Sequence, residues 1–312
     1  MHNNSILITG AAGNIGSYLV DKFVEENWKV TGIDNLLTGN LKNVNSNIYK
    51  IIIDNFDSKN ILERIRKKEF DVILHNAAIP RVLYSVEHPS ETNDINVGKT
   101  VRLLEACVNN IKRFVFASSS SVYGNVLRND LPVIPEHLKN PISPYALQKS
   151  IIEDYCRIFS NLYNIDTICL RYFNVISSRA KGDSPYSTVV SAWLDAIKNN
   201  RPLRFDGDGN QTRDLCYIDN IVQANFLAVN SNLSFKGDCF NVACGDEISN
   251  NEIFNFLKKR FPNITVINAN TRPGDVKYMC ANIEKTKNIL GYKNVISFWK
   301  GLERIIFQLF NS

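Results

Sequence analysis

The chain has 312 residues, of which 44% are hydrophobic and 21% are charged, and its formal net charge is +5 at pH 7. This length suits one large α/β unit or two domains that share a cleft, and the composition is ordinary for a globular protein. The basic residues are scattered, which argues against a nucleic-acid partner, and no apolar run approaches the roughly 18 residues of a membrane span.

A glycine-rich turn follows the first predicted strand directly. The strand covers residues 5–9, the turn GAAGNIG covers residues 10–16, and a helical pattern comes next. In such a turn Gly10 allows the tight bend, and Gly13 lets the backbone approach a pyrophosphate at the helix N-terminus. Gly16 permits close packing of the helix on the strand. The sequence therefore predicts a dinucleotide site at this turn.

The following strands end in acidic or polar residues. The second strand, residues 30–33, ends at Asp34, whose carboxylate can accept both hydroxyls of an adenosine ribose and would repel a 2′-phosphate. A third strand ends at Asp54, and a fourth ends at His75. We expect His75 to shape the loop rather than to act as a base or a metal ligand. Asp34 predicts that the site prefers NAD to NADP.

The middle of the chain places hydroxyl groups at the end of a fifth strand. A helix over 101–107 precedes this strand, residues 114–117, and the run 118–121 consists of four serines. Because ligands of open α/β sheets lie at the carboxyl ends of the strands, this cluster is well placed to contact a reacting group. Elsewhere, four serines would be read as a solvated loop.

Tyr145 and Lys149 are four residues apart, after Pro144. Pro144 suits the first turn of a helix, so the two side chains share one helix face. An ammonium beside a phenol can lower the pKa of the phenol from about 10 toward working pH. Taken alone, this spacing also occurs in helices with no catalytic role. The glycine turn and the serine cluster make the pair a candidate proton relay.

Together these motifs resemble the extended short-chain dehydrogenase/reductase superfamily, with its G-x-x-G-x-x-G turn and Tyr-x-x-x-Lys pair. The resemblance implies NAD as cofactor and a catalytic trio of Ser119, Tyr145 and Lys149, with Ser120 and Ser121 as second choices for the hydroxyl. Tyr145 would take the proton of a sugar hydroxyl, Lys149 would stabilise the phenolate, and Ser119 would orient the hydroxyl. The implied cofactor contacts are Gly10, Gly13, Asn14, Ile15, Gly16, Asp34, Asn35, Asp54, Asn55, Ala77, Tyr145 and Lys149.

Two later motifs narrow the resemblance. RYFNV at 171–175 and RDLCYIDN at 213–220 are similar to segments of NAD-dependent nucleotide-sugar epimerases, closest to the bacterial UDP-N-acetylglucosamine 4-epimerases. Asn174, Arg213 and Arg272 would then hold the substrate diphosphate, and Met279 would stand beside the sugar. Asp219 is expected to be the N-cap of a helix over 221–228. The implied substrate contacts are Ser85, Ser119, Ser120, Tyr145, Asn174, Ser187, Val189, Phe205, Arg213, Arg272, Asp275 and Met279.

Other functions are also compatible with parts of the sequence. Dehydratases of the group carry an Asp-Glu pair after the catalytic hydroxyl, and this chain has Ser120 and Ser121 there, so no acid is placed to protonate a leaving hydroxyl. A uronic-acid 4-epimerase, decarboxylase or reductase would need a carboxylate-binding arginine, for which Arg81 and Arg179 are candidates. A cofactor-binding scaffold without turnover is disfavoured by the intact trio.

We therefore expect an α/β protein, a doubly wound parallel (Rossmann) sheet with a smaller α/β substrate-binding lobe at the C-terminal end. The NAD-binding domain would span 1–174 with a later return near 214–244, and 175–312 would form most of a discontinuous nucleotide-sugar-binding lobe. The expected reaction is 4-epimerisation of a UDP-sugar, either UDP-GlcNAc/UDP-GalNAc or UDP-Glc/UDP-Gal, and hence isomerase activity. Seven dispersed cysteines without a Cys-x-x-Cys pair argue against disulfides and zinc and favour the cytoplasm. A homodimer is implied by the resemblance, and no metal, membrane or secretory leader is expected.

Overall fold

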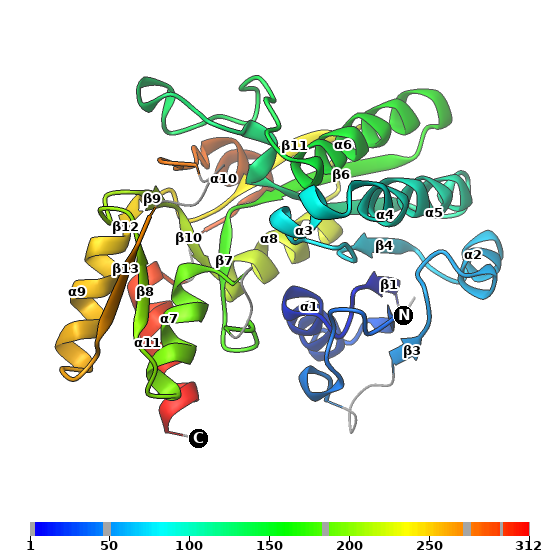
Figure 1. Ribbon diagram of the computed structural model, residues 1–312. Helices are drawn as coiled ribbons and strands as arrows, with labels where there is room; N and C mark the ends of the chain where they lie inside the picture. Colours follow the sequence, from blue (N-terminus) through cyan, green and yellow to red (C-terminus); the bar gives the residue numbers. More distant parts are fainter. Residues whose placement is uncertain (1–3, 46–50, 183–186, 271–275, 294–295, 312) are drawn as a thin grey trace.

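A seven-stranded parallel sheet organises the molecule (Figure 1). The computed structural model describes residues 4–45, 51–182, 187–270, 276–293 and 296–311. The strand order is β11-β6-β5-β4-β1-β2-β3, so the order reverses between β1 and β4, where α/β sheets bind their ligands. The strands are β1 (Ser5–Thr9), β2 (Lys29–Asp34), β3 (Ile51–Ile53), β4 (Val72–His75), β5 (Arg113–Ser119), β6 (Asp166–Tyr172) and β11 (Asp238–Val242).

Helices cover both faces of the sheet. Ile6 and Ile8 of β1 pack into the hydrophobic core on one face and Leu7 into the core on the other, as expected for a strand whose side chains alternate. Helices α1 (Asn14–Glu25) and α8 (Ile218–Asn230) lie on the first face. Helices α2 (Lys59–Arg66), α5 (Lys99–Cys107) and α6 (Pro144–Tyr163) lie on the second.

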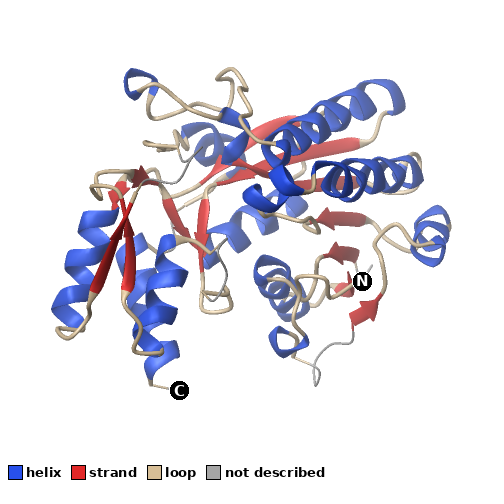
Figure 2. Cartoon of the chain, viewed as in Figure 1, coloured by secondary structure: helices blue, strands red, loops and turns tan. Residues whose placement is uncertain are grey.

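A smaller lobe stands beside the sheet and contains the C-terminus (Figure 2). Helices flank three short strand pairs there, in which β7 pairs with β10, β8 with β13 and β9 with β12. The lobe and the adjoining segments comprise β7 (Asn174–Ile176), α7 (Val189–Lys198), β8 (Leu203–Asp206), β9 (Thr212–Arg213), β10 (Leu215–Tyr217), β12 (Ile248–Ser249), α9 (Asn250–Arg260), β13 (Val266–Ala269), α10 (Glu284–Leu290) and α11 (Phe298–Phe310).

Short helical turns complete the chain. Two of them, α3 and α4, connect β4 to α5, and a π-helical turn over Asp94–Gly98 leads into α5. The remaining elements are α3 (Val82–Glu87), α4 (Pro89–Asn93) and the 3₁₀ turns Leu41–Asn43, Ser120–Tyr123 and Arg128–Asp130. In the part of the chain that the structure describes, no helix is long and apolar enough to cross a membrane.

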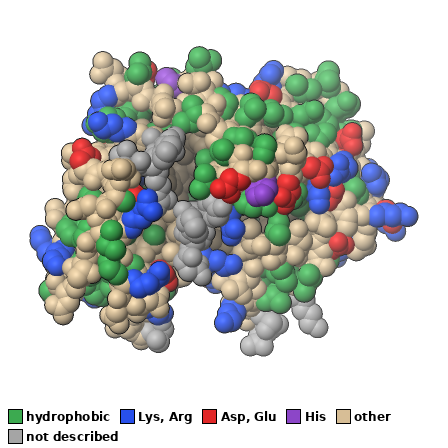
Figure 3. Space-filling model, viewed as in Figure 1, with side chains coloured by type: hydrophobic (Ala, Val, Ile, Leu, Met, Phe, Trp, Pro, Cys, Tyr) green, Lys and Arg blue, Asp and Glu red, His purple; other side chains and the backbone are tan. Residues whose placement is uncertain are grey.

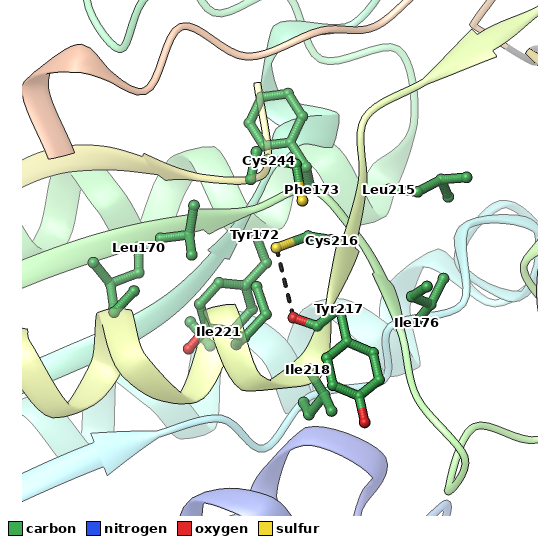
Figure 4. Close-up of a cluster of buried hydrophobic side chains, with 14 of the residues drawn as sticks. Leu170, Tyr172, Phe173, Ile176, Leu215, Cys216, Tyr217, Ile218, Ile221 and Cys244 are labelled. Carbon is green, nitrogen blue, oxygen red and sulfur yellow. Dashed lines mark hydrogen bonds between the residues drawn. The ribbon is translucent and has the colours of Figure 1, made fainter. Parts of the chain in front are cut away.

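The sheet and the lobe share one hydrophobic core. Figure 4 shows Leu170 and Tyr172 of β6 beside Cys216, Tyr217 and Ile221, which come from β10 and α8. The Cys216 thiol donates a weak hydrogen bond to the Tyr217 carbonyl, with 3.8 Å between sulfur and oxygen. Because apolar contacts are continuous across this junction, the lobe is packed against the end of the sheet that carries the site.

The predicted doubly wound parallel sheet is confirmed. The sequence predicts that the chain returns to the NAD-binding domain near 214–244, and α8 and β11 occupy this part of the chain. The domain boundary between residues 174 and 175 stays a prediction. The N-cap expected at Asp219 is wrong, because β10 runs into α8 without a loop and Tyr217 occupies the N-cap position. Asp219 lies in the first turn instead, 3.5 Å from the Arg304 guanidinium.

Candidate active site

A pocket opens at the carboxyl ends of β1, β2, β4 and β5. The space that it encloses is about 1030 Å³, including its open mouth. On the face drawn in Figure 3 the surface is hollowed between the C-terminal lobe and the sheet. Ten of the predicted cofactor contacts line the pocket: Gly10, Gly13, Asn14, Ile15, Asp34, Asn35, Asp54, Ala77, Tyr145 and Lys149.

The glycine turn leaves room for a phosphate at the start of α1. Gly10 has φ of +70°, and a Cβ there would lie 3.0 Å from the backbone of Ala77. A Cβ on Gly16 would collide with the carbonyl of Gly10, so α1 packs closely on the turn. Gly13 is the N-cap, and no side chain caps the helix. The N–H groups of the first turn therefore face the pocket as donors for an anion.

Asp34 lies at the end of β2, buried beside this turn. Its two carboxylate oxygens accept hydrogen bonds from the backbone N–H of Ala12 at 3.0 Å and of Leu36 at 2.7 Å. Each oxygen keeps a second lone pair, so the fixed carboxylate can also accept from ribose hydroxyls. Farther along the pocket the Asn35 amide donates to Asn55 at 3.0 Å.

His75 shapes the wall of the pocket. The Thr9 hydroxyl accepts from the N–H groups of Asn76 and Ala77, so its own proton goes to His75 Nδ1, 2.8 Å away. The other ring nitrogen, Nε2, then donates to the Thr100 hydroxyl at 2.9 Å. Burial lowers the pKa of His75 to about 3, assisted by the charge of Lys149. Neutral His75 thus fixes the loop after β4, as the sequence predicts.

Tyr145 and Lys149 face the pocket from the first turns of α6. The Ser143 hydroxyl caps this helix, and Pro144 occupies its first turn. The Lys149 ammonium donates to the Ala117 carbonyl at 2.7 Å and lies 5.9 Å from the centre of the Tyr145 ring. Burial raises the pKa of Tyr145 to about 12, opposed by a hydrogen bond with Ser119. Burial lowers the pKa of Lys149 to about 8, opposed first by Glu153.

Ser119 is oriented by the turn that follows it. Its oxygen accepts from the backbone N–H of Ser121 at 3.2 Å and from the Ser121 hydroxyl at 2.9 Å. Because both bonds occupy lone pairs, the Ser119 proton is available to Tyr145 or to a substrate oxygen. The structure therefore brings the three predicted catalytic residues together, with Ser121 as the group that orients Ser119.

Comparison with known proteins agrees with this geometry. Residues 6–243 match the NAD dependent epimerase/dehydratase family. The chain belongs to this family. A putative UDP-glucose 4-epimerase of Methanocaldococcus jannaschii is 39% identical over 307 residues, covering 96% of this chain and 97% of the relative.

Two solved structures share the fold closely. The UDP-N-acetylglucosamine 4-epimerase of Methanobrevibacter ruminantium, in complex with UDP-N-acetylmuramic acid, superposes with a TM-score of 0.91 at 34% identity, covering 100% of this chain and 99% of the other. The UDP-glucose 4-epimerase of Thermus thermophilus, in complex with NAD, gives 0.87 at 27% identity and covers 98% of both chains. The predictions of an extended short-chain dehydrogenase/reductase fold, of NAD as the cofactor and of an epimerase, an isomerase, are confirmed.

In this member of the family the predicted substrate residues lie on both sides of the cleft. Asn174 begins β7 and pairs in register with Leu215, next to the strand of Arg213. Phe205 stacks on Trp193 with 5.5 Å between ring centres, Ser187 donates to the Lys181 carbonyl at 2.7 Å, and Val189 begins α7. Arg272 and Asp275 lie outside the described residues. Contact of any of these with a substrate stays a prediction.

Ser85 and Met279 are buried. The Ser85 hydroxyl donates to the Val82 carbonyl at 2.5 Å and accepts from the backbone N–H of Tyr145 at 3.0 Å, so Ser85 ties α3 to the start of α6. Met279 is 4% exposed and packs into the larger hydrophobic core. Their predicted contacts with a substrate therefore depend on side-chain movement or on a ligand that reaches into the core.

Several buried polar residues near the site were not singled out from the sequence. Asn96, in the π-helical turn, accepts from the Ile79 N–H at 2.8 Å and donates to Gln148 at 2.8 Å, which joins the pocket wall to α6. Glu153 and Arg171 form a buried ion pair behind Lys149. The spacing of Tyr145, Lys149 and Glu153 at i, i+4 and i+8 was the one signal that could have indicated Glu153. Among the described side chains no group of three or more His, Cys, Asp or Glu could hold a metal ion.

Proposed function

We propose that this chain catalyses the NAD-dependent 4-epimerisation of a UDP-sugar, with UDP-GlcNAc and UDP-GalNAc as the first substrate pair to test and UDP-Glc and UDP-Gal as the second. One observation carries the proposal. A buried phenol, an ammonium and an oriented serine hydroxyl meet beside the glycine turn of a dinucleotide fold. A sugar hydroxyl placed there can lose its proton to Tyr145 while the carbon that bears it gives up hydride.

The residues of the chain divide the work. When bound, NAD would supply a reversible hydride acceptor for the sugar carbon. Tyr145 takes the hydroxyl proton as a phenolate. Burial disfavours this phenolate in the free protein, because it raises the pKa of the phenol to about 12. The Lys149 ammonium and the positive nicotinamide ring favour the phenolate. Ser119 donates to the sugar oxygen, and the proton returns from Tyr145 when the transient 4-keto sugar is reduced on its other face.

The 4-keto sugar must rotate in the pocket before its other face can be reduced. This rotation requires that the substrate be held mainly by its nucleotide. We assign this role to Asn174, Arg213 and Arg272, since guanidinium groups bind diphosphates through paired hydrogen bonds. Phe205 would pack on the base, and Ser187 and Val189 would border it. Asp275 would bind the ribose. Of these residues, the ones that the structure describes belong to β7 and to segments of the C-terminal lobe.

N-acetyl sugars are favoured as the substrate for two reasons. The Methanobrevibacter relative, with 34% identity over the whole chain, is named as a UDP-N-acetylglucosamine 4-epimerase. The residue proposed beside the sugar is Met279, an unbranched and adaptable side chain rather than a rigid aromatic ring.

Incubation of the purified protein with UDP-GlcNAc, UDP-Glc and UDP-GlcA in separate reactions tests the proposal. The expected result is formation of the C4 epimer of UDP-GlcNAc, with no net NADH. Tyr145→Phe should abolish the reaction while the protein retains NAD. Release of CO₂ or stoichiometric NADH would contradict epimerisation, and an active Tyr145→Phe would contradict the role of Tyr145.

A uronic-acid substrate is the alternative. Two arginines could bind its carboxylate. Arg179 forms an ion pair with Asp21 at 2.6 Å and lies 4.0 Å above the Tyr18 ring, and its buried Nη1 has no hydrogen-bond partner among the described residues. Arg81, the N-cap residue of α3, is the other candidate. Preferential turnover of UDP-GlcA that Arg81→Met eliminates would favour this alternative, or a decarboxylase or reductase if the product differs.

We also propose a homodimer that forms through the outer surface of α6. Leu147, Ile158 and Leu162 expose 49%, 41% and 70% of their surface on this helix. Light scattering should give twice the chain mass, and Leu162→Glu should shift it toward the monomer. A cytoplasmic location is supported by the seven free thiols, and a role in making polysaccharide precursors follows from the proposed substrates.

A further inference from the structure

The contact between α6 and the end of β5 contains three successive polar links. Three residues of α6, each one turn after the last, meet three consecutive residues of β5. The links join Tyr145 to Ser119, Lys149 to the Ala117 carbonyl and Glu153 to Ser118. The first two links belong to the proposed proton relay. The third link, between Glu153 and Ser118, is not part of that relay.

Glu153 is the most firmly held of the six residues. It is 2% exposed, and its Oε1 accepts from the Ser118 hydroxyl at 2.6 Å and from Arg171 Nε at 2.7 Å. Its Oε2 accepts from Arg171 Nη2 at 2.7 Å, and the Lys139 ammonium lies 3.6 Å away. A bidentate pair of this kind fixes both side chains. Arg171 is fixed in turn by the Tyr123 hydroxyl and the Pro135 carbonyl.

Lys149 lies one helical turn before this carboxylate on α6. The ammonium has one hydrogen bond to protein in the structure, to a neutral carbonyl, and it lies 4.7 Å from the centre of the Phe116 ring. Burial acts against its charged form, and Glu153 is the first group that acts in favour of it. Three other titratable groups lie near Lys149, and each favours its neutral form. Burial lowers the pKa of His75 and raises that of the Tyr145 phenol, and a hydrogen bond with Cys156 together with burial raises that of the Cys169 thiol.

Two cations contact the Glu153 carboxylate, Arg171 from β6 and Lys139 from the loop before α6. Tyr123 and Cys239 are the other titratable groups nearby. Burial raises the pKa of Tyr123, and a hydrogen bond with Cys169 together with burial raises the pKa of Cys239. Ser118 donates to the Glu153 carboxylate as a neutral group.

We infer that Glu153 is a positioning residue of this active site, whose buried carboxylate keeps the Lys149 ammonium protonated and fixes the end of β5 against α6. The inference rests on the proposed function, in which the charged Lys149 ammonium stabilises the phenolate of Tyr145. Ser118, between Ala117 and Ser119 in the chain, transmits the fixed position of Glu153 to both neighbouring links.

Titration of Lys149 in the NAD-loaded protein tests the inference. Lysine labelled with ¹³C at Cε reports ionisation by NMR, and Lys149→Met identifies the resonance. The midpoint should fall by about one pH unit in Glu153→Gln, at the lower end of the effect of a nearby charge. An unchanged midpoint in folded, NAD-retaining Glu153→Gln overturns the inference.

Asp154→Asn is the matched control. It also removes one negative charge from α6 and one ion pair of Lys139, at 3.0 Å, but its side chain is half-exposed. Its Lys149 midpoint should equal that of the parent, and an equal fall in both variants overturns the specific role of Glu153. If Glu153→Gln does not fold because Arg171 is left unpaired, the neutral pair Glu153→Gln/Arg171→Gln replaces it. The expected fall is then smaller, because the loss of the Arg171 charge favours the Lys149 ammonium, and an unchanged or higher midpoint overturns the inference.

Ser118→Ala tests the structural half of the inference. It should lower kcat several-fold with KM and the Lys149 midpoint unchanged, and a parental kcat would overturn the positioning of β5 through Ser118. The alkaline limb of the pH–kcat profile should move to lower pH in Glu153→Gln only. Since the NMR titration requires no turnover, a parent protein without epimerase activity would refute the proposed function and leave the titration to decide the role of Glu153.

Discussion

The ammonium of Lys149 donates to the backbone carbonyl of Ala117, with 2.7 Å between nitrogen and oxygen. This bond anchors the cation to the strand that also carries Ser119, so the two partners of Tyr145 are positioned by one short segment. A backbone acceptor satisfies the ammonium without neutralising it, which leaves its field available to a phenolate.

Replacement of Lys149 by methionine should therefore lower kcat for UDP-sugar epimerisation by about 100-fold or more, because the phenolate loses its neighbouring cation. Initial rates of the parent and of Lys149→Met measure the effect. Lys112→Met is the control, since Lys112 is exposed and forms an ion pair with Asp71 at 2.8 Å, away from the pocket. A Lys149→Met protein with parental kcat would show that the ammonium has no part in proton transfer.

Asp34 should decide between the two dinucleotides. Asp34→Asn removes a negative charge that strengthens hydrogen bonds from the ribose hydroxyls and repels a 2′-phosphate. NAD should therefore bind about 10-fold more weakly, and the affinity for NADP should rise relative to that for NAD. Calorimetric titration of the cofactor-free protein measures both. Asp21→Asn, on α1, removes a carboxylate that is not among the residues lining the pocket and should leave the ratio unchanged. An unaltered ratio in Asp34→Asn would remove Asp34 from the recognition of the ribose.

The dinucleotide half of the molecule was predictable because its signals are local. Gly10, Gly13 and Gly16 lie within one turn, and apolar runs flank them. Tyr145 and Lys149 lie on one helix, so their proximity follows from helical geometry. The same reasoning placed Asp34 at a strand end, where the structure has it.

Long-range pairing was not predictable from one sequence. Glu153 meets Arg171 across a helix and a strand, and Asn96 meets Gln148 across 52 positions. Met279 was assigned to the sugar from its distance along the chain from Asp275. The structure shows the side chain buried in the larger core, and its contact with the sugar stays a prediction. The N-cap was predicted two residues too late, at Asp219 instead of Tyr217, because the sequence does not show that β10 and α8 are continuous.

Gly16 should tolerate no side chain. The Cβ of alanine would collide with the Gly10 carbonyl, which is backbone and cannot rotate away. We expect Gly16→Ala to lower the free energy of unfolding by about 1–3 kcal/mol, as for other overpacked sites, with loss of bound NAD. Urea denaturation measures the change. In Gly98→Ala the new Cβ would lie 3.0 Å from a flexible Asp94 oxygen, so stability should stay near that of the parent. Equal stability of both variants would contradict the close packing of α1 on the turn.

His75 should make the protein sensitive to mild acid. Burial lowers its pKa to about 3 from 6.5. Between these values the unfolded chain binds a proton that the folded protein does not, so the free energy of unfolding falls as the pH falls from 6.5 toward 3, by up to about 1.4 kcal/mol per unit. Above pH 6.5 the stability is fully present.

His75→Gln removes this titration, so between pH 7 and 5 the parent should lose about 2 kcal/mol more than the variant. Urea denaturation at the two pH values gives the difference, whatever the absolute stability of His75→Gln. His88→Gln, at an exposed histidine that lies 4.4 Å from the Tyr84 ring, should keep the parental dependence on pH. If His75→Gln and the parent lose the same free energy, His75 is protonated in the folded protein, and its bond from the Thr9 hydroxyl must be broken.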